Sequence, residues 1–283
     1  MTNIKDKFIS YISNDKNIRR IPTGMAKIDE AFEGGLPTGL IILGAITGIG
    51  KTTFVLQLAD NMAKQPNTKV LFFSLELRDI ELMAKSLSRI SYLNEDLTSH
   101  TPNEFIGRKV ENIDDYFNKY DEIIDNIFLV DTENNITSIV NNSKAFCRKY
   151  ADDNIIVVID YLQFINPDNN GNDKQNIDYI IRELKKLSRD YGVSIIAISS
   201  INRTSYKNNT IGSFKESGSI EYTADYLLAL NQKEEKETLL EVNNLYKKYD
   251  LKGDYTIQDI CLYGKAGEIV AILGHNGAGK STT

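Results

Sequence analysis

Residues 40–52 read LIILGAITGIGKT, an apolar run followed by a glycine-rich loop that ends in Lys51 and Thr52. The run is typical of a buried strand, and the pattern after the loop predicts a helix over residues 51–63. Such a loop turns backbone N–H groups toward phosphate, and the dipole of the following helix also favours an anion. We therefore expect a nucleotide site formed by Ala45, Thr47, Gly48, Ile49, Gly50, Lys51, Thr52 and Thr53.

Two acidic residues follow or end apolar runs further along the chain. Glu76 follows the run over residues 70–75, and Asp160 ends the run over residues 155–160. Nucleotide hydrolysis needs a group that activates water and groups that hold magnesium. We predict Glu76 as the catalytic base and Asp160 as a magnesium ligand together with Thr52, while Lys51 reaches the outer phosphates. The alternative is that each acid caps a helix or faces solvent.

Short β-branched runs alternate with amphipathic stretches from residue 40 onward. This alternation predicts an α/β fold, a mostly parallel central sheet flanked by helices. Strands are predicted over residues 40–45, 70–75, 127–131, 155–160, 194–199 and 226–230. Helices are predicted over residues 51–63, 79–93, 137–150 with Thr137 as N-cap, and 176–191. Loops are expected over residues 166–174 and 202–213, and a short amphipathic helix outside the core over residues 4–12.

The composition narrows the class of protein. The chain has 283 residues, of which 41% are hydrophobic and 25% charged, and its net charge is −6. These values are ordinary for a globular protein and argue against DNA binding over the whole surface, although a local basic loop is compatible with them. Cys147 and Cys261 lack metal-ligand spacing and are expected to be reduced buried thiols. Without a signal core or a membrane-length apolar run, we expect a cytoplasmic protein.

Seven short motifs occur in an order that resembles a known family. They are IPTG at 21–24, GGLP at 34–37, GKTT at 50–53, SLE at 74–76, IDYLQ at 159–163, NR at 202–203 and ESGSIE at 216–221. Together they resemble the ATPase domain of DnaB-type replicative helicases, within the RecA-like group. The resemblance covers about residues 18–231.

The resemblance implies an ATPase that moves along single-stranded DNA and forms a homo-oligomeric ring such as a hexamer. It implies ATP and Mg²⁺ as ligands and adds Ser200 and Arg203 to the nucleotide site. The loops after Asp160 and Arg203 would follow DNA in the ring's channel. Between residues 203 and 215 the sequence has three basic residues and no acidic one, and aromatic residues are present for base stacking. The predicted DNA contacts are Arg203, Lys207 and Lys215; the alternative is a solvated loop.

The sequence departs from the family pattern in three places. Ser200 stands where the family has a phosphate-sensing glutamine, and its hydroxyl has a shorter reach. The family's N-terminal helical domain is absent, so that residues 1–17 supply at most a linker helix that docks on a neighbouring subunit. The family's basic finger toward a neighbour's ATP is also missing, and we therefore expect slow hydrolysis.

A second glycine-rich loop lies near residue 283. Residues 239–283 resemble the start of an ABC-transporter ATP-binding subunit, and 232–238 form a junction after the ATPase domain over 18–231. Strand-like runs occupy 239–245, 257–262 and 268–273. The segment ends before the helix and acids of a complete site, so we expect a non-catalytic tail. The resemblance assigns to this loop Tyr249, Gly274, Asn276, Gly277, Gly279, Lys280 and Ser281.

Three functions follow from these observations. The first is an ATP-hydrolysing DnaB-like motor acting on single-stranded DNA in replication. The second is a nucleotide-binding regulatory module with little turnover, which Ser200 and the missing finger would favour. The third is a fragment of an ABC-transporter ATPase subunit, which depends on residues 239–283 alone.

Overall fold

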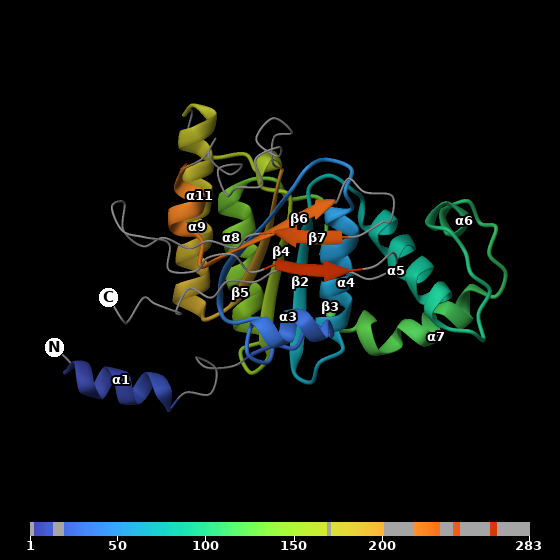
Figure 1. The fold of residues 1–283 in the computed structure, drawn as a ribbon, viewed down its shortest axis with the longest axis horizontal. Coiled ribbons are helices and arrows are strands. Elements are labelled where there is room, and N and C mark those ends of the chain that lie inside the picture. Colours follow the sequence, from blue (N-terminus) through green and yellow to red (C-terminus); the bar gives the residue numbers. More distant parts are fainter. Residues whose placement is uncertain are drawn as a thin grey trace.

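A sheet flanked by helices forms the body of the protein (Figure 1). The computed structural model describes residues 3–13, 20–168, 171–200, 218–232, 240–243 and 261–264. The strand order is β3-β2-β4-β5-β1-β6-β7-β8. The strands are β1 (Gly39–Ala45), β2 (Thr68–Ser74), β3 (Ile127–Val130), β4 (Asn154–Asp160), β5 (Ser194–Ser200), β6 (Tyr226–Gln232), β7 (Leu240–Asn243) and β8 (Cys261–Gly264).

The helices connect parallel strands and lie on both faces of the sheet. They are α1 (Ile4–Ile12), α3 (Ala26–Ala31), α4 (Lys51–Ala63), α5 (Asp79–Leu93), α6 (Pro102–Ile106), α7 (Ile113–Ile124), α8 (Ile136–Lys149), α9 (Asp173–Tyr191) and α11 (Gly218–Thr223), with a 3-10 turn η1 (Leu162–Phe164). The chain crosses from β1 to β2 in one direction and from β3 through β4 to β5 in the other. Because such crossovers are right-handed, α4 covers one face and α8 and α9 cover the opposite one.

The central strands are buried on both faces. Every residue of β1 is buried, as are all residues of β4 after Asn154. Strands β1 to β6 pair in parallel, so that their carboxyl ends share one edge of the sheet. The registers of Ala45 with Ser200 and of Ser74 with Asp160 define this edge. The predicted α/β fold with a mostly parallel sheet is therefore confirmed.

The predicted elements agree closely with the observed ones. All six predicted strands are present with ends within two residues of the prediction, and the helices over 51–63 and 79–93 coincide with α4 and α5. The helix expected over 4–12 is α1, and its side chains at Ile4, Phe8 and Ile9 are exposed. Helix α7 was not predicted.

Two helix starts differ from the prediction. Thr137 was wrong as the N-cap of α8, because the side-chain oxygen of Asn135 accepts hydrogen bonds from the backbone N–H groups of Thr137 and Ser138. Helix α9 begins at Asp173, since Asn172 accepts from the N–H of Gln175 at 2.9 Å and forms a capping box with it. The loop expected over 166–174 therefore ends earlier, and the loop expected over 202–213 lies outside the described residues.

Two short strands extend the sheet beyond β6. Strand β7 pairs antiparallel with β6, with Asn231 opposite Glu241, and β8 pairs antiparallel with β7. β7 falls within the run expected over 239–245, whereas β8 overlaps only the end of the run over 257–262. The run over 268–273 lies outside the described residues. The described strands on either side of residues 233–239 thus belong to one sheet.

Candidate active site

The loop between β1 and α4 has the backbone that its glycines allow. Gly48 and Gly50 have φ angles of 90° and 96°, in the left-handed region. No atom lies within 4 Å of a Cβ placed on either residue, so that backbone conformation rather than crowding requires glycine. Helix α4 begins at Lys51 directly after this loop. The N-terminus of a 13-residue helix is therefore presented where phosphate is expected.

Lys51 folds back over the loop. Its Nζ donates to the carbonyl oxygens of Ala45 at 3.0 Å and Ile46 at 3.1 Å. Partial burial lowers the pKa of Lys51, while the charges of Asp160 and Glu76 act to raise it. The lysine and both predicted acids therefore lie close enough to interact electrostatically.

Asp160 is a buried carboxylate at the carboxyl end of β4. Its side chain is 1% exposed, and neither carboxylate oxygen has a hydrogen-bonding partner among the described residues. Burial raises its pKa to about 6, and the charge of Glu76 raises it further, whereas the Thr52 side chain and Lys51 oppose the rise. An unpaired buried charge is unfavourable unless a cation or a hydrogen bond compensates it. Asp160 and Thr52 therefore suit a hard cation such as Mg²⁺, which prefers oxygen ligands.

Glu76 lies two residues beyond the end of β2. The backbone N–H of Leu75 donates to the carbonyl oxygen of Asp160 at 2.7 Å, which continues the β2–β4 pairing past Ser74. Glu76 is exposed, and its charge contributes to the raised pKa of Asp160 and of Tyr161. The two acids thus share one edge, with one buried and the other accessible to water.

Ser200 lies at the same edge but interacts through its backbone. Its N–H donates to Gln163 Oε1 at 3.3 Å, and its carbonyl oxygen accepts from Gln163 Nε2 at 3.4 Å. Gln163 was not among the predicted site residues, although it belongs to the IDYLQ motif. Arg203, Lys207, Lys215, Tyr249 and the loop over 274–281 lie outside the described residues.

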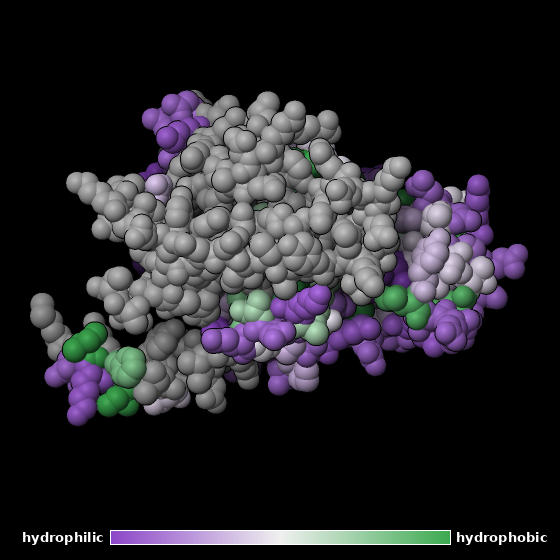
Figure 2. Space-filling model, viewed as in Figure 1, coloured by the Kyte–Doolittle hydropathy of each residue, from purple (hydrophilic) through white to green (hydrophobic). Residues whose placement is uncertain are grey.

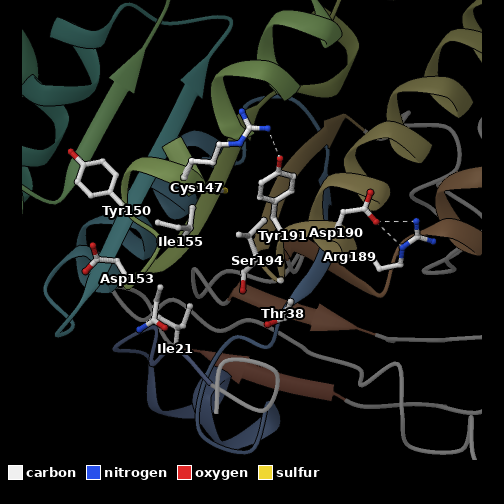
Figure 3. A pocket seen from close by; sticks show the side chains of 15 residues that line it. Ile21, Thr38, Cys147, Tyr150, Asp153, Ile155, Arg189, Asp190, Tyr191 and Ser194 are labelled. Atoms are coloured by element: carbon white, nitrogen blue, oxygen red, sulfur yellow. Dashed lines mark hydrogen bonds and ion pairs between the residues drawn. The ribbon is translucent and has the colours of Figure 1, made fainter. Parts of the chain in front are cut away.

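A hollow of about 460 Å³ lies at the opposite edge of the sheet (Figure 3). It is lined by Asn154 and Ser194, at the amino ends of β4 and β5, and by the last residues of α8 and α9. Within it, Arg148 donates to the Tyr191 hydroxyl at 3.2 Å, and Arg189 pairs with Asp190. Ligands of open α/β sheets bind at the carboxyl ends of the strands. We therefore do not assign the nucleotide to this hollow.

Two searches concern only the described part of the chain. It holds no group of three or more His, Cys, Asp or Glu side chains arranged to bind a metal. No helix in it is long and apolar enough to cross a membrane. Cys147 is a buried free thiol, and burial raises its pKa to about 11.

A parallel sheet with a glycine-rich loop between β1 and α4, and acids at neighbouring strand ends, defines a P-loop nucleotide-binding protein. The family model described as DnaB-like helicase C terminal domain matches residues 20–257. The chain belongs to this family, as the motif resemblance predicted. The match continues past the junction expected over 232–238, into the segment that resembles an ABC-transporter subunit.

Known proteins agree with this assignment. The chain is 30% identical over 264 residues to the replicative DNA helicase DnaB of Geobacillus stearothermophilus, covering 85% of this chain and 56% of that protein. It thus spans about half the length of the curated relatives it matches. A solved structure described as an ATPase domain matches with a TM-score of 0.72 and 23% identity, over 93% of this chain and 95% of that one. A structure described as a DnaB-like replicative helicase and its interactions with primase matches with a TM-score of 0.68 and 23% identity, over 92% and 62%. At this identity the two structures show the fold.

Proposed function

We propose that this chain is the ATP-hydrolysing motor domain of a DnaB-like helicase that acts on single-stranded DNA in replication. The observation that carries the proposal is the buried Asp160 carboxylate, unpartnered among the described residues, in the same electrostatic environment as Lys51 and Glu76. A structural acid at that position would be expected to have a hydrogen-bonding partner. The family membership supports the same function.

Each residue of the site has a proposed role. The loop backbone and Lys51 bind the phosphates of ATP, and Thr52 and Asp160 hold Mg²⁺. When bound, Mg²⁺ neutralises charge on the phosphate oxygens. The exposed Glu76 accepts a proton from the water that attacks the terminal phosphate, because its carboxylate is accessible to water at the edge where the phosphates lie. Lys51 stabilises the charge that develops during transfer.

The DNA contacts are proposed from sequence and family. Arg203, Lys207 and Lys215 follow β5 in the chain, and β5 ends beside the phosphate loop, with Ser200 in register with Ala45. Basic residues on a segment that starts at the nucleotide site suit a motor, because hydrolysis and DNA contact are then linked through one strand. The relatives named above are replicative helicases.

We also propose that copies of the chain assemble into a ring, such as a hexamer. Helix α1 lies apart from the sheet, and Figure 2 shows its apolar side chains on the surface. Ile4 is 79% exposed and Phe8 61%. An amphipathic helix with an uncovered apolar face suits docking on a neighbouring subunit.

The resemblance of residues 239–283 to an ABC-transporter subunit stays a prediction. The family match overlaps this segment up to residue 257, which supports a single functional ATP site at residues 45–53. We propose that the loop over 274–281 is non-catalytic.

The variant Glu76→Gln tests the proposed function. Its amide retains the size of the side chain but cannot accept the proton, so we expect ATPase activity stimulated by single-stranded DNA to fall at least about 100-fold. ATP affinity, measured with a fluorescent analogue, should change less than about threefold. Glu111→Gln, at an exposed position away from this edge, is the control. Tight ATP binding without turnover in the unaltered chain would instead support a regulatory module.

A further inference from the structure

Gln163 joins the ends of two strands at the nucleotide edge. It lies in η1, three residues after Asp160, and its side chain is directed to the end of β5. Its Nε2 donates to Ser199 Oγ at 3.0 Å and to the carbonyl oxygen of Ser200 at 3.4 Å, and its Oε1 accepts from the N–H of Ser200 at 3.3 Å. One amide therefore makes three contacts with the last two residues of the neighbouring strand.

These contacts complete a path around the phosphate loop. Ser200 is in register with Ala45, the last residue of β1, and the carbonyl oxygen of Ala45 accepts from Lys51 Nζ at 3.0 Å. On the other side, Gln163 continues the chain from Asp160, which interacts electrostatically with the same lysine. The amide of Gln163 is the side-chain link in this path between the segment after β4 and the end of β5.

The three contacts differ in strength. The bond to Ser199 has an ordinary length, and Ser199 is buried. The two bonds to Ser200 are longer than the usual 2.9–3.0 Å and are therefore weaker. Gln163 is itself exposed. It can therefore keep its bond to Ser199 while exchanging Ser200 for another polar partner, such as a water molecule bound to phosphate.

We propose that Gln163 is a positioning residue that relays occupancy of the nucleotide site to the end of β5. The inference rests on the proposed function, because it requires nucleotide at residues 45–53. When phosphate or its water competes for the amide, the backbone of Ser200 changes its hydrogen bonding. The residues that follow Ser200 in the sequence include Arg203, so that this change lies between the ATP site and the proposed DNA contacts. The short hydroxyl of Ser200 is not needed for the relay, because Gln163 binds the backbone of that residue.

Hydrogen–deuterium exchange on the full chain tests the relay. The probe is AMP-PNP with Mg²⁺, and exchange is compared with and without it. In the unaltered chain we expect the probe to slow exchange in peptides that contain residues 45–53 and to change exchange at least twofold in peptides that contain Ser199 and Ser200. In Gln163→Ala the first effect should remain and the second should fall to a third or less. Gln65→Ala is the control, because this glutamine also makes a 3.4 Å amide-to-carbonyl bond but lies at the far end of α4.

A second variant separates the relay from simple packing. Gln163→Glu keeps length and volume but removes the donor to Ser199, and we expect it to lose the nucleotide-dependent change as Gln163→Ala does. Two results would overturn the inference and leave the proposed function intact: equal nucleotide-dependent changes at Ser199 and Ser200 in the variants and the unaltered chain, or faster exchange there in Gln163→Ala by the same factor with and without the probe. Absence of any change at residues 45–53 in the unaltered chain would instead contradict the proposed function.

Discussion

Lys51 is held over the phosphate loop by two backbone carbonyls and interacts with two carboxylates, so that its charge is placed before any ligand arrives. We expect Lys51→Ala to weaken ATP binding by about 100-fold or more, equivalent to about 2.7 kcal/mol. Lys280→Ala should change it by less than about twofold, because the family match ends before the second loop. Titration calorimetry of both variants with ATP and Mg²⁺ measures the difference. The opposite pattern would move the nucleotide site to residues 274–281.

Asp160 has a cost in the free protein that its proposed role explains. Its pKa is raised from 3.8 to about 6, so the folded chain binds more protons than the unfolded chain between these values, and the free energy of unfolding falls as pH rises through this window. The difference of roughly two pH units corresponds to at most about 3 kcal/mol. Asp160→Asn removes the buried charge and should raise the free energy of unfolding by about 1–3 kcal/mol at pH 8 in the presence of EDTA.

Urea denaturation at several pH values checks this expectation, and the dependence between pH 4 and 6 should flatten in Asp160→Asn. Asp168→Asn is the contrasting control. The pKa of Asp168 is lowered, chiefly by the side chains of Thr137 and Asn135, so that its substitution should not stabilise the fold. Destabilisation by Asp160→Asn at pH 8 would show that the carboxylate has a structural partner.

Three helices on the α4 face are joined by one buried carboxylate. Asp60 of α4 is fully buried and accepts from Ser86 and Arg89 of α5 at 2.6 Å and from the Tyr120 hydroxyl of α7 at 2.8 Å. Burial and the charge of Asp60 raise the pKa of Tyr120, which keeps the phenol a donor. Because α4 begins at the phosphate loop, the network fixes that helix against the rest of its layer.

We expect Asp60→Ala to lower the free energy of unfolding by about 3–5 kcal/mol, because Arg89 is then left without its partner in a partly buried position. Tyr120→Phe removes one hydrogen bond and should cost about 1–2 kcal/mol. The control is Asp96→Asn, which breaks an exposed pair with Lys119 and should cost less than about 1 kcal/mol. Urea denaturation measures all three. Equal losses for Asp60→Ala and Asp96→Asn would contradict the network.

The strands could be predicted from the sequence because central parallel strands are continuous apolar runs between polar residues, as in β1 and β4. Glu76 and Asp160 followed from the same reasoning, since strand ends fix their edge. Helix α7 was missed although its buried residues Tyr116, Tyr120 and Ile123 recur at helical spacing, because tyrosines among many charges make a weak apolar pattern. Gln163 could not be found in this way, because its partner Ser199 is 36 residues away in the sequence.

The whole molecule combines a buried sheet core with a helix whose apolar side chains face outward. The core unites residues from β1 to β6 and the helices around them, whereas Ile4, Phe8 and Ile9 of α1 are exposed. Stability and assembly are therefore expected to depend on different parts of the chain. Covering these three side chains on a neighbouring copy would contribute on the order of 3 kcal/mol, given about 1.5–3 kcal/mol for each fully buried side chain.

This separation predicts the effect of changing α1. The triple variant Ile4→Ser, Phe8→Ser and Ile9→Ser should weaken self-association at least about tenfold by sedimentation velocity in the presence of ATP, because each subunit loses its apolar docking face. Its free energy of unfolding should stay within about 0.5 kcal/mol, since these side chains are exposed. Lys5→Ser with Asp6→Ser, on the same helix but polar, is the matched control and should assemble normally. Normal assembly of the triple variant would show that α1 does not join the subunits, and a large loss of stability would show that the helix packs on its own core.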